Sequence, residues 1–304
     1  MTVFLGCGFE TTLRSRIGQF DGNPLWASAC LLSDPKVIVD AYRDFIKAGV
    51  DVLVTDTYQA SLQGFETHLG LDEQQARDLF KKSVSLCKEA IQIEKDSGTI
   101  DKNKEILIMG STGSYGAILA DGSEYTGDFI LKYPIEHIRD FQRTQIQIRS
   151  ESGCDLIGLF TIATSEEAFM LAELLKEFPN VKAILTFSVK DGEYLSGGEK
   201  FEEVASKCWS LNPAQLLAVG VNCAKPSYID SLFAPLKGKI PLCAITLTEE
   251  NWDHEKNQWI PLDEDYLPFV YKWSQIGVQY IGGGCQTSYS SIQKIAKMIK
   301  GSDV

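Results

Sequence analysis

Short apolar runs alternate with longer amphipathic segments along the whole chain. Eight of these runs have the length of a β-strand, and most of them are continuously apolar, as expected for strands that are covered on both faces. They lie at Val3–Gly6, Val52–Thr55, Ile106–Ser111, Leu156–Thr161, Ala183–Ser188, Leu216–Asn222, Pro241–Thr246 and Gln279–Gly283. The pattern therefore predicts eight buried strands.

The segments between the strands carry apolar residues at helical spacing. The predicted helix Pro35–Ala48 follows a Ser-Asp pair, which supplies capping residues, and it places a proline in its first turn. The other predicted helices are Asp72–Ser97, Ile135–Ser150, Glu166–Glu177, Glu202–Trp209, Ser227–Phe233, Tyr266–Gln275 and Ser288–Lys300. Gly49, Gly153 and Gly277 each stand between a helix and a strand, where a left-handed glycine can end the helix.

This alternation of strand and helix predicts a single (β/α)8 TIM barrel that takes in residues 1–304 as one domain. A doubly wound open sheet is the alternative. However, Gly6-Cys7-Gly8 after the first strand lacks the third glycine of a dinucleotide-binding fingerprint. The longest insertions, at residues 112–133 and 189–200, both follow strands. We therefore expect both to cover the face of the barrel that carries active sites.

The charge of the chain limits the partners that it can have. The formal net charge is −12, and Lys and Arg form no cluster, so nucleic acid and anionic membranes are not expected as partners. No apolar run approaches the roughly 20 residues that span a bilayer. No basic residue precedes the first apolar stretch, so we expect a cytoplasmic protein. The eight cysteines have no regular spacing and are expected to be reduced thiols.

Two glycine-flanked cysteines stand directly after predicted strands. Cys223 closes the segment Gly220–Cys223, and Cys285 closes the segment Gly282–Cys285. Both cysteines would lie at the C-terminal ends of barrel strands, where two thiolates can hold a Zn2+ ion. A catalytic zinc site takes three protein ligands and keeps a fourth position open. These two segments alone leave the third ligand unidentified.

Six motifs along the chain carry a resemblance to a known family. They are Leu25–Ser28, Thr57–Ser61, Gly110–Gly113 with Tyr115–Ala117, Ala120–Tyr125, Gly220–Cys223 and Gly282–Thr287. In this order, and from Val3 to Met298, the chain resembles the homocysteine S-methyltransferases. The resemblance implies a TIM barrel and methyl transfer to homocysteine, which gives methionine. The implied donor is a sulfonium such as S-methylmethionine or S-adenosylmethionine or, in a related branch, glycine betaine. Zn2+ held by three cysteines is implied as the cofactor.

The chain departs from the family pattern at the implied metal and substrate sites. Gly284 stands where the first of two adjacent zinc-binding cysteines belongs. Gly6 stands in place of an aspartate after the first strand, and Phe160 in place of a glutamate after the fourth. The resemblance implies that these two carboxylates hold the ammonium group of homocysteine. A segment after the seventh strand that is rich in Pro, Asn and Gly is replaced by Ile245–Thr248.

One candidate for the third zinc ligand stands at the end of the first strand. Cys7 lies there, beside the last strand once the barrel closes, and we hypothesise that it completes a site with Cys223 and Cys285. The alternative is that Cys7 only fills a small space in the barrel mouth. Cys243 stands earlier in its strand and is expected below the mouth.

The candidate site residues are of two kinds. Cys223 and Cys285 are the expected catalytic residues and, with Cys7, the expected metal ligands. The substrate-binding candidates at the strand ends are Gly8, Phe9, Tyr58, Gln59, Asn222 and Thr287. A further set comprises the loop residues Asp121, Glu124 and Tyr125, expected over the site, and His68, His137 and His254, expected on the surface away from the strand ends.

Two functions remain open from the sequence. A working zinc-dependent methyltransferase would act on small molecules, a thiol acceptor and a sulfonium methyl donor. Its acceptor need not be homocysteine, because both implied ammonium anchors are replaced. The alternative is a family member that has lost the reaction and binds a small molecule or an active paralogue. The sequence does not predict the oligomeric state.

Overall fold

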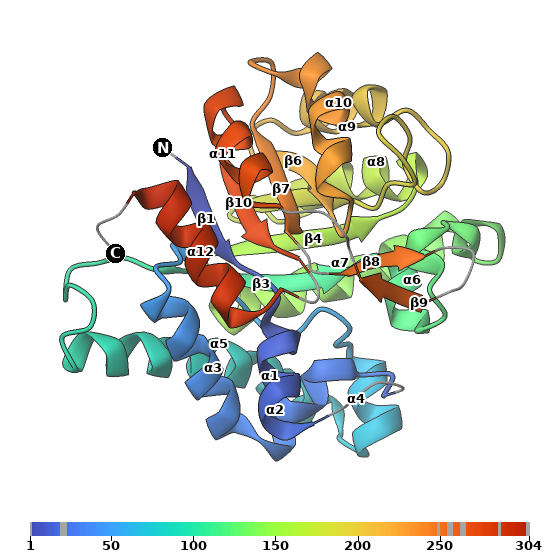
Figure 1. The fold of residues 1–304 in the computed structure, drawn as a ribbon. Helices are drawn as coiled ribbons and strands as arrows, with labels where there is room; N and C mark the ends of the chain where they lie inside the picture. Colours follow the sequence, from blue (N-terminus) through green and yellow to red (C-terminus); the bar gives the residue numbers. More distant parts are fainter. Residues whose placement is uncertain are drawn as a thin grey trace.

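Eight parallel strands close into a barrel that is surrounded by helices (Figure 1). The computed structural model describes residues 2–18, 23–247, 250–253, 258–261, 266–284 and 287–301. The barrel strands are β1 (Val3–Gly6), β2 (Val52–Val54), β3 (Leu107–Gly113), β4 (Leu156–Ile162), β5 (Ala183–Phe187), β6 (Leu216–Asn222), β7 (Leu242–Leu247) and β10 (Tyr280–Gly283). They are hydrogen-bonded in the order β1-β10-β7-β6-β5-β4-β3-β2, and the ring closes between β2 and β1. The predicted (β/α)8 barrel and its eight strands are confirmed.

The eight predicted helices are all present, with ends that differ by a few residues. They are α3 (Pro35–Lys47), α5 (Glu73–Asp96), α7 (Ile135–Ser152), α8 (Ser165–Leu174), α9 (Phe201–Leu211), α10 (Ile229–Phe233), α11 (Leu267–Ile276) and α12 (Tyr289–Lys300). Gly49, Gly153 and Gly277 have φ values of 94°, 86° and 89°, which confirms the left-handed backbone predicted there. Within the described ranges, no helix has the length and apolar character needed to cross a membrane.

Several shorter elements carry no clear signal in the sequence. They are the helices α1 (Phe9–Ile17), α2 (Cys30–Ser33), α4 (Leu62–Leu69) and α6 (Tyr115–Leu119), the 3-10 helices η1 (Trp26–Ala29), η2 (Ser123–Tyr125), η3 (Asp128–Leu131), η4 (Leu175–Glu177), η5 (Pro226–Tyr228) and η6 (Ala234–Leu236), and the hairpin β8 (Glu250–Asp253) and β9 (Gln258–Pro261). The start of α1 is hidden because its N-cap residue is Gly8, which has a left-handed backbone and no capping side chain.

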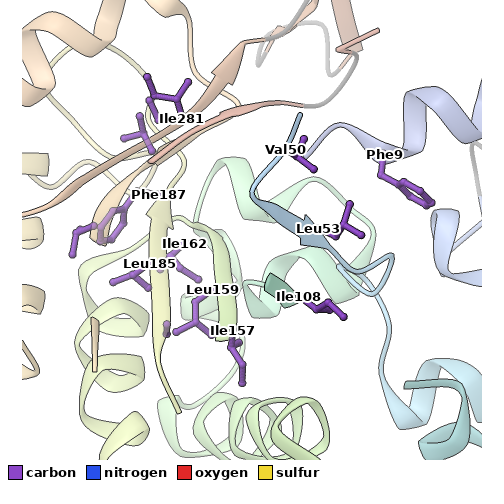
Figure 2. Close-up of a cluster of buried hydrophobic side chains, with 14 of the residues drawn as sticks. Phe9, Val50, Leu53, Ile108, Ile157, Leu159, Ile162, Leu185, Phe187 and Ile281 are labelled. Carbon is purple, nitrogen blue, oxygen red and sulfur yellow. The ribbon is translucent and has the colours of Figure 1, made fainter. Parts of the chain in front are cut away.

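Apolar side chains fill both the inside of the barrel and the layer between strands and helices. On β4, Leu156 and Phe160 belong to the inner cluster, whereas Ile157 and Leu159 pack in the outer layer (Figure 2). Successive residues of a strand point to opposite faces, so both faces of β4 are buried. This double burial is the reason that the strands read as continuous apolar runs.

The connection after β3 covers the barrel mouth, as predicted. Gln59 Nε2 donates a hydrogen bond to Ala117 O (3.0 Å), and Ser188 Oγ donates one to Glu124 O (2.7 Å). These contacts tie α6 and η2 to the ends of β2 and β5. The segment 189–200 behaves differently. It folds back on itself through bridges from Val189 to Leu195 and from Tyr194 to Lys200, and its residues do not line the mouth cavity.

Candidate active site

A cavity of about 700 Å³ opens at the C-terminal ends of the barrel strands. This volume lies within the range of small-molecule sites. Its described lining residues at or just beyond the strand ends include Gly6, Cys7, Val54, Asp56, Ser111, Phe160, Asn222, Cys223, Ile245 and Gly284, and those above them include Trp26, Ile118, Leu119, Glu124 and Tyr125. The cavity lies where barrel enzymes carry their active sites.

Asn222, the last residue of β6, braces three neighbouring strands. Its Oδ1 accepts hydrogen bonds from Thr161 N (2.8 Å) and from Thr186 Oγ1 (2.7 Å). Its Nδ2 donates to Thr161 Oγ1 (2.7 Å) and to Cys223 Sγ (3.3 Å). The buried amide thus uses both of its donors and both acceptor positions. Asn222 lines the cavity as predicted, and its contacts show that it positions Cys223.

Cys223 is held in an unusual backbone conformation. Its φ is 52°, and that of Thr161 on β4 is 61°, in the left-handed region that residues other than glycine seldom adopt. The Cys223 amide also donates to Ile245 O (3.1 Å). Strain of this kind persists only where the surroundings enforce it, and it clusters at functional sites. The strained backbone and the Asn222 amide together hold the half-buried Cys223 thiol at the cavity wall.

Cys7 lies beside β10 and lines the same cavity as Cys223. Its Sγ lies 3.6 Å from the position that a Cβ on Gly282 would take. Burial raises the pKa of the Cys7 thiol well above its usual value, and Cys243, Glu10 and Cys223 raise it further in that order. Cys7 and Cys223 are therefore electrostatic neighbours. Cys243 is fully buried and lies outside the described cavity lining, below the mouth as expected.

The thiols present have the chemistry that zinc requires. Cys7 and Cys223 line one cavity, and Gly284, directly before Cys285, lines it too. Cys285 itself lies outside the described residues. Among the residues that the structure does describe, no group of three or more His, Cys, Asp or Glu side chains could hold a metal ion. The three-cysteine site therefore stays a prediction.

Gly8 and Phe9 shape the cavity without pointing a polar group into it. Gly8 has a φ of 87°, and a Cβ on it would lie 2.7 Å from Gly284 O. This close approach brings the end of β1 against the segment that leads to Cys285. The Phe9 ring stacks on Tyr42, with 4.4 Å between the ring centroids, and belongs to the buried cluster shown in Figure 2. Phe9 therefore packs mainly against the helical layer.

The remaining substrate-binding candidates differ in their positions. Tyr58 and Gln59 are half-buried and line the cavity. The Tyr58 ring meets Trp26 edge-on, with a centroid distance of 6.4 Å. Thr287 is fully buried, lies outside the cavity lining, and donates to Gly284 O (2.8 Å). Its position indicates that it orders the segment before Cys285.

The predicted positions of the loop residues over the site, and of the histidines away from it, are confirmed in part. Glu124 and Tyr125 line the cavity, whereas exposed Asp121 caps its own turn by accepting a hydrogen bond from Ser123 N (2.9 Å). Of the histidines, His68 is exposed but contributes to the cavity rim, which corrects the expectation that it lies away from the site. His137 is exposed and pairs with Tyr115 Oη (2.9 Å). His254 lies outside the described residues.

Three buried carboxylates line the cavity within the described part of the chain, and two of them were not predicted as site residues. Glu10, Asp56 and Glu124 are 8%, 9% and 7% exposed. Burial, and after it the charge of Glu10, raises the pKa of Asp56 well above its usual range. Burial raises the pKa of Glu124 to about 7. The available signal was position, because Asp56 directly follows a predicted strand and Glu10 comes three residues after Cys7.

Comparison with known proteins identifies the family of the chain. The family model described as homocysteine S-methyltransferase matches residues 3–299. The chain belongs to the homocysteine S-methyltransferase family. It is 33% identical to betaine-homocysteine S-methyltransferase of Drosophila melanogaster, over 99% of this chain and 96% of that protein. It is 34% identical to selenocysteine Se-methyltransferase of Brassica oleracea, over 96% and 87%. The metallated form of the homocysteine methyltransferase MmuM from Escherichia coli superposes with a TM-score of 0.83, at 29% identity, covering 97% of this chain and 95% of that one.

The departures of this family member from the family pattern lie in the cavity itself. Gly6 and Phe160 both line it, at the positions where the resemblance implies carboxylates. The Phe160 ring fills the barrel interior over Gly158, because a Cβ on Gly158 would lie 2.2 Å from its Cζ. The cavity thus has an apolar wall at this point, and its acidic groups stand elsewhere.

Proposed function

We propose that this family member is a working methyltransferase. It transfers a methyl group from a sulfonium donor, such as S-methylmethionine or S-adenosylmethionine, to a thiol acceptor such as homocysteine, giving methionine. Zn2+ would be held by Cys223, Cys285 and Cys7. The observation that carries the proposal is that Cys7 and Cys223 line one cavity at the C-terminal ends of the strands.

The chemistry of the site supports this reaction. When bound, zinc would favour the deprotonated form of the acceptor thiol, which is otherwise mostly protonated near neutral pH. The acceptor sulfur attacks the methyl carbon of the donor, and the new S–C bond forms while the donor S–C bond breaks. The donor leaves as a neutral thioether, so the step removes a positive charge. A cavity that excludes water favours such a step.

The chain's own residues prepare this geometry. Asn222 orients the Cys223 thiol through the bond from Nδ2 to Sγ, and the strained backbone of Cys223 fixes its direction. Phe160, Ile118 and Leu119 contribute apolar surface that keeps water from the reacting sulfur. Glu124 places a carboxylate in the cover of the cavity, where a cationic donor can approach it.

Zinc content and methyl transfer test the proposal together. Zinc is measured by elemental mass spectrometry on protein that has been purified without chelator or nickel. We expect about one zinc ion per chain. We also expect a lower content in Cys7→Ser and in Cys223→Ser. The matched control is Cys154→Ser, because Cys154 is a half-buried thiol that precedes β4 at the opposite end of the barrel.

Each result separates the two functions that the sequence leaves open. Zinc together with methyl transfer to at least one thiol supports the enzyme. Unchanged zinc in Cys7→Ser would remove Cys7 from the ligand set. A protein that takes up no zinc, even in excess metal, and that methylates no thiol would be a binding protein of this family.

A further inference from the structure

Asp56 is a buried carboxylate in the cavity whose purpose the proposed methyl transfer does not explain. It lies two residues after the end of β2, is 9% exposed and lines the cavity. Its Oδ2 is buried and has no hydrogen-bond partner among the described residues. Its backbone amide donates to Tyr42 Oη (3.0 Å), so the fold fixes its position. Leaving a buried acceptor without a donor costs stability, which indicates that a ligand supplies the donor.

Glu10 on α1 stands close to Asp56. It is 8% exposed and lines the same cavity. Its charge raises the pKa of Asp56 and also that of the Cys7 thiol, so it is an electrostatic neighbour of both. The two carboxylates repel each other, and burial strengthens that repulsion. A cation bound in the cavity beside this pair would supply a partner for Asp56 Oδ2 and would reduce the repulsion between the two carboxylates.

Basic side chains are few in the described lining of the cavity. Among the described lining residues, Arg14 and His68 are the basic side chains. Arg14 lies one helical turn after Glu10 on α1, and His68 is exposed at the rim. Burial and the charge of Glu10 both oppose the ionisation of Asp56, and a cation bound beside its carboxylate would favour the ionised form. Buried charges in proteins are paired or bind a cation, so the ligand is expected to bring a positive charge.

The kind of cation follows from the unused hydrogen-bond position. A sulfonium centre or a quaternary ammonium carries charge but offers no N–H donor to Asp56 Oδ2. A divalent metal ion needs more oxygen ligands than two carboxylates provide, and the described residues contain no metal-binding group of three. A primary ammonium group supplies both a positive charge and N–H donors.

We propose that Glu10 and Asp56 bind the ammonium group of the thiol acceptor and thereby select an amino thiol. The inference rests on the proposed methyl transfer for its choice of acceptor. Glu10 is a neighbour of Cys7, so the ammonium site and the thiol site lie within the reach of one small molecule. Gly6 and Phe160 line the same cavity without charge, so the acidic pair supplies the carboxylates that those two positions lack.

Glu124 is a further buried carboxylate of the cavity, but it stands in a different place. Its Oε2 is buried without a partner among the described residues, and its acidic neighbour is Asp121 in the covering loop. Glu10, in contrast, is coupled to both Asp56 and the thiol at the floor of the mouth. The acidic pair is therefore better placed than Glu124 to bind the amino group of a molecule whose sulfur lies at the thiols.

Acceptors with and without the amino group test this inference. Methyl transfer is measured with homocysteine and with 4-mercaptobutanoate, which is homocysteine without its amino group. For the unaltered protein we expect a preference for homocysteine in kcat/KM on the order of 100-fold. In Asp56→Asn and in Glu10→Gln we expect most of this preference to disappear, because kcat/KM for homocysteine should fall far more than kcat/KM for 4-mercaptobutanoate. The KM of the methyl donor should stay the same.

A surface carboxylate provides the matched control. Glu136 is exposed on α7 and does not line the cavity, so Glu136→Gln removes one negative charge and should keep the full preference. A preference that survives in both Asp56→Asn and Glu10→Gln would overturn the inference. A loss confined to the KM of the donor would also overturn it, because the bound ammonium would then belong to the donor.

A binding measurement decides the matter even if no thiol is methylated. Calorimetry compares methionine with 4-(methylthio)butanoate, which lacks the amino group. Binding of methionine that is much tighter, and that weakens in Asp56→Asn, supports the ammonium site although the proposed reaction has failed. Equal binding of the two compounds, or binding of neither, overturns the inference. Circular dichroism of each variant shows that a loss of binding does not come from unfolding.

Discussion

The two sides of the cavity mouth differ in whether their buried polar groups have hydrogen-bond partners within the described protein. On the β4–β6 side, formed by Thr161, Thr186, Asn222 and Cys223, the amide of Asn222 uses every hydrogen-bond position within the protein. On the β1–β2 side, formed by Cys7, Glu10 and Asp56, two carboxylates are buried together, and Asp56 Oδ2 has no partner among the described residues.

The difference separates a scaffold from a binding surface. A buried polar network whose members are all satisfied is rigid, and it can hold a thiol in a strained backbone conformation. A buried carboxylate with an unused oxygen destabilises the fold until a ligand arrives. Substitutions on the two sides should therefore change stability with opposite signs, and the contrast can be tested directly.

The largest effect is expected at Asn222. Asn222→Ala removes the partner of Thr161 N and of Thr186 Oγ1, and it also removes the hydrogen bond to Cys223 Sγ. We expect the free energy of unfolding to fall by about 3 kcal/mol, because buried groups lose their hydrogen bonds and a cavity forms. Urea denaturation measures the change, and zinc content should fall with it.

Thr186→Val serves as the comparison, since it removes a single bond of the same network. Its expected cost is about 1 kcal/mol. If Asn222→Ala cost no more than Thr186→Val, the residues of the β4–β6 side would not act as a unit. The distinction between scaffold and binding surface would then be lost on this side.

A smaller effect is expected at the close approach between the two thiol segments. Gly8 has φ 87° and ψ 19°, and a Cβ on it would lie 2.7 Å from Gly284 O. Gly8→Ala therefore forces two backbone segments apart, at an expected cost of about 2 kcal/mol. If Cys7 and Cys285 share a zinc ion, this separation should also lower the zinc content.

Gly277 offers a control with nearly the same backbone. Its φ is 89° and its ψ is 29°, and a Cβ there would meet nothing within 4 Å. Gly277→Ala should cost about 1 kcal/mol from conformation alone and leave zinc unchanged. Equal losses of stability in the two variants would show that the contact with Gly284 contributes nothing.

The fold could be predicted from the sequence because the barrel strands are buried on both faces. Continuous apolar runs such as Leu156–Thr161 mark them clearly, and left-handed glycines mark the helix ends. The first helix was missed for a local reason. It begins at Phe9, with only two residues between it and the end of β1, and its N-cap Gly8 has no side chain, so the sequence shows neither a capping side chain nor a connecting loop.

A site residue could be predicted only where its position in the sequence, such as the end of a strand, determines that it lies at the cavity. Cys7, Cys223 and Asn222 stand at strand ends, so their place at the cavity followed from the barrel. Asp56 also follows a strand, but acidic residues after strands are commonly solvated, and the sequence does not show that this one is enclosed. Glu10 occupies the first turn of a helix, where an acidic residue is favoured by the helix dipole without any ligand.

Asp56→Asn is expected to have the smallest effect on stability, and the effect has the opposite sign. Because the pKa of Asp56 is raised in the fold, ionisation destabilises the folded protein. Below the unfolded pKa of about 4 the carboxyl is protonated in both states, and the cost is absent. As the pH rises above that value, the cost grows towards the raised folded pKa.

The variant should therefore match the unaltered protein near pH 4 and become more stable than it, by about 1 kcal/mol, towards pH 8. Urea denaturation between these pH values, without ligand, measures the gap. Glu136→Gln, on the surface, should show no such gap. If Asp56→Asn is more stable and also binds amino thiols poorly, then the Asp56 carboxylate lowers the stability of the fold and is needed for ligand binding. A destabilised variant would mean that Asp56 belongs to the scaffold, like Asn222.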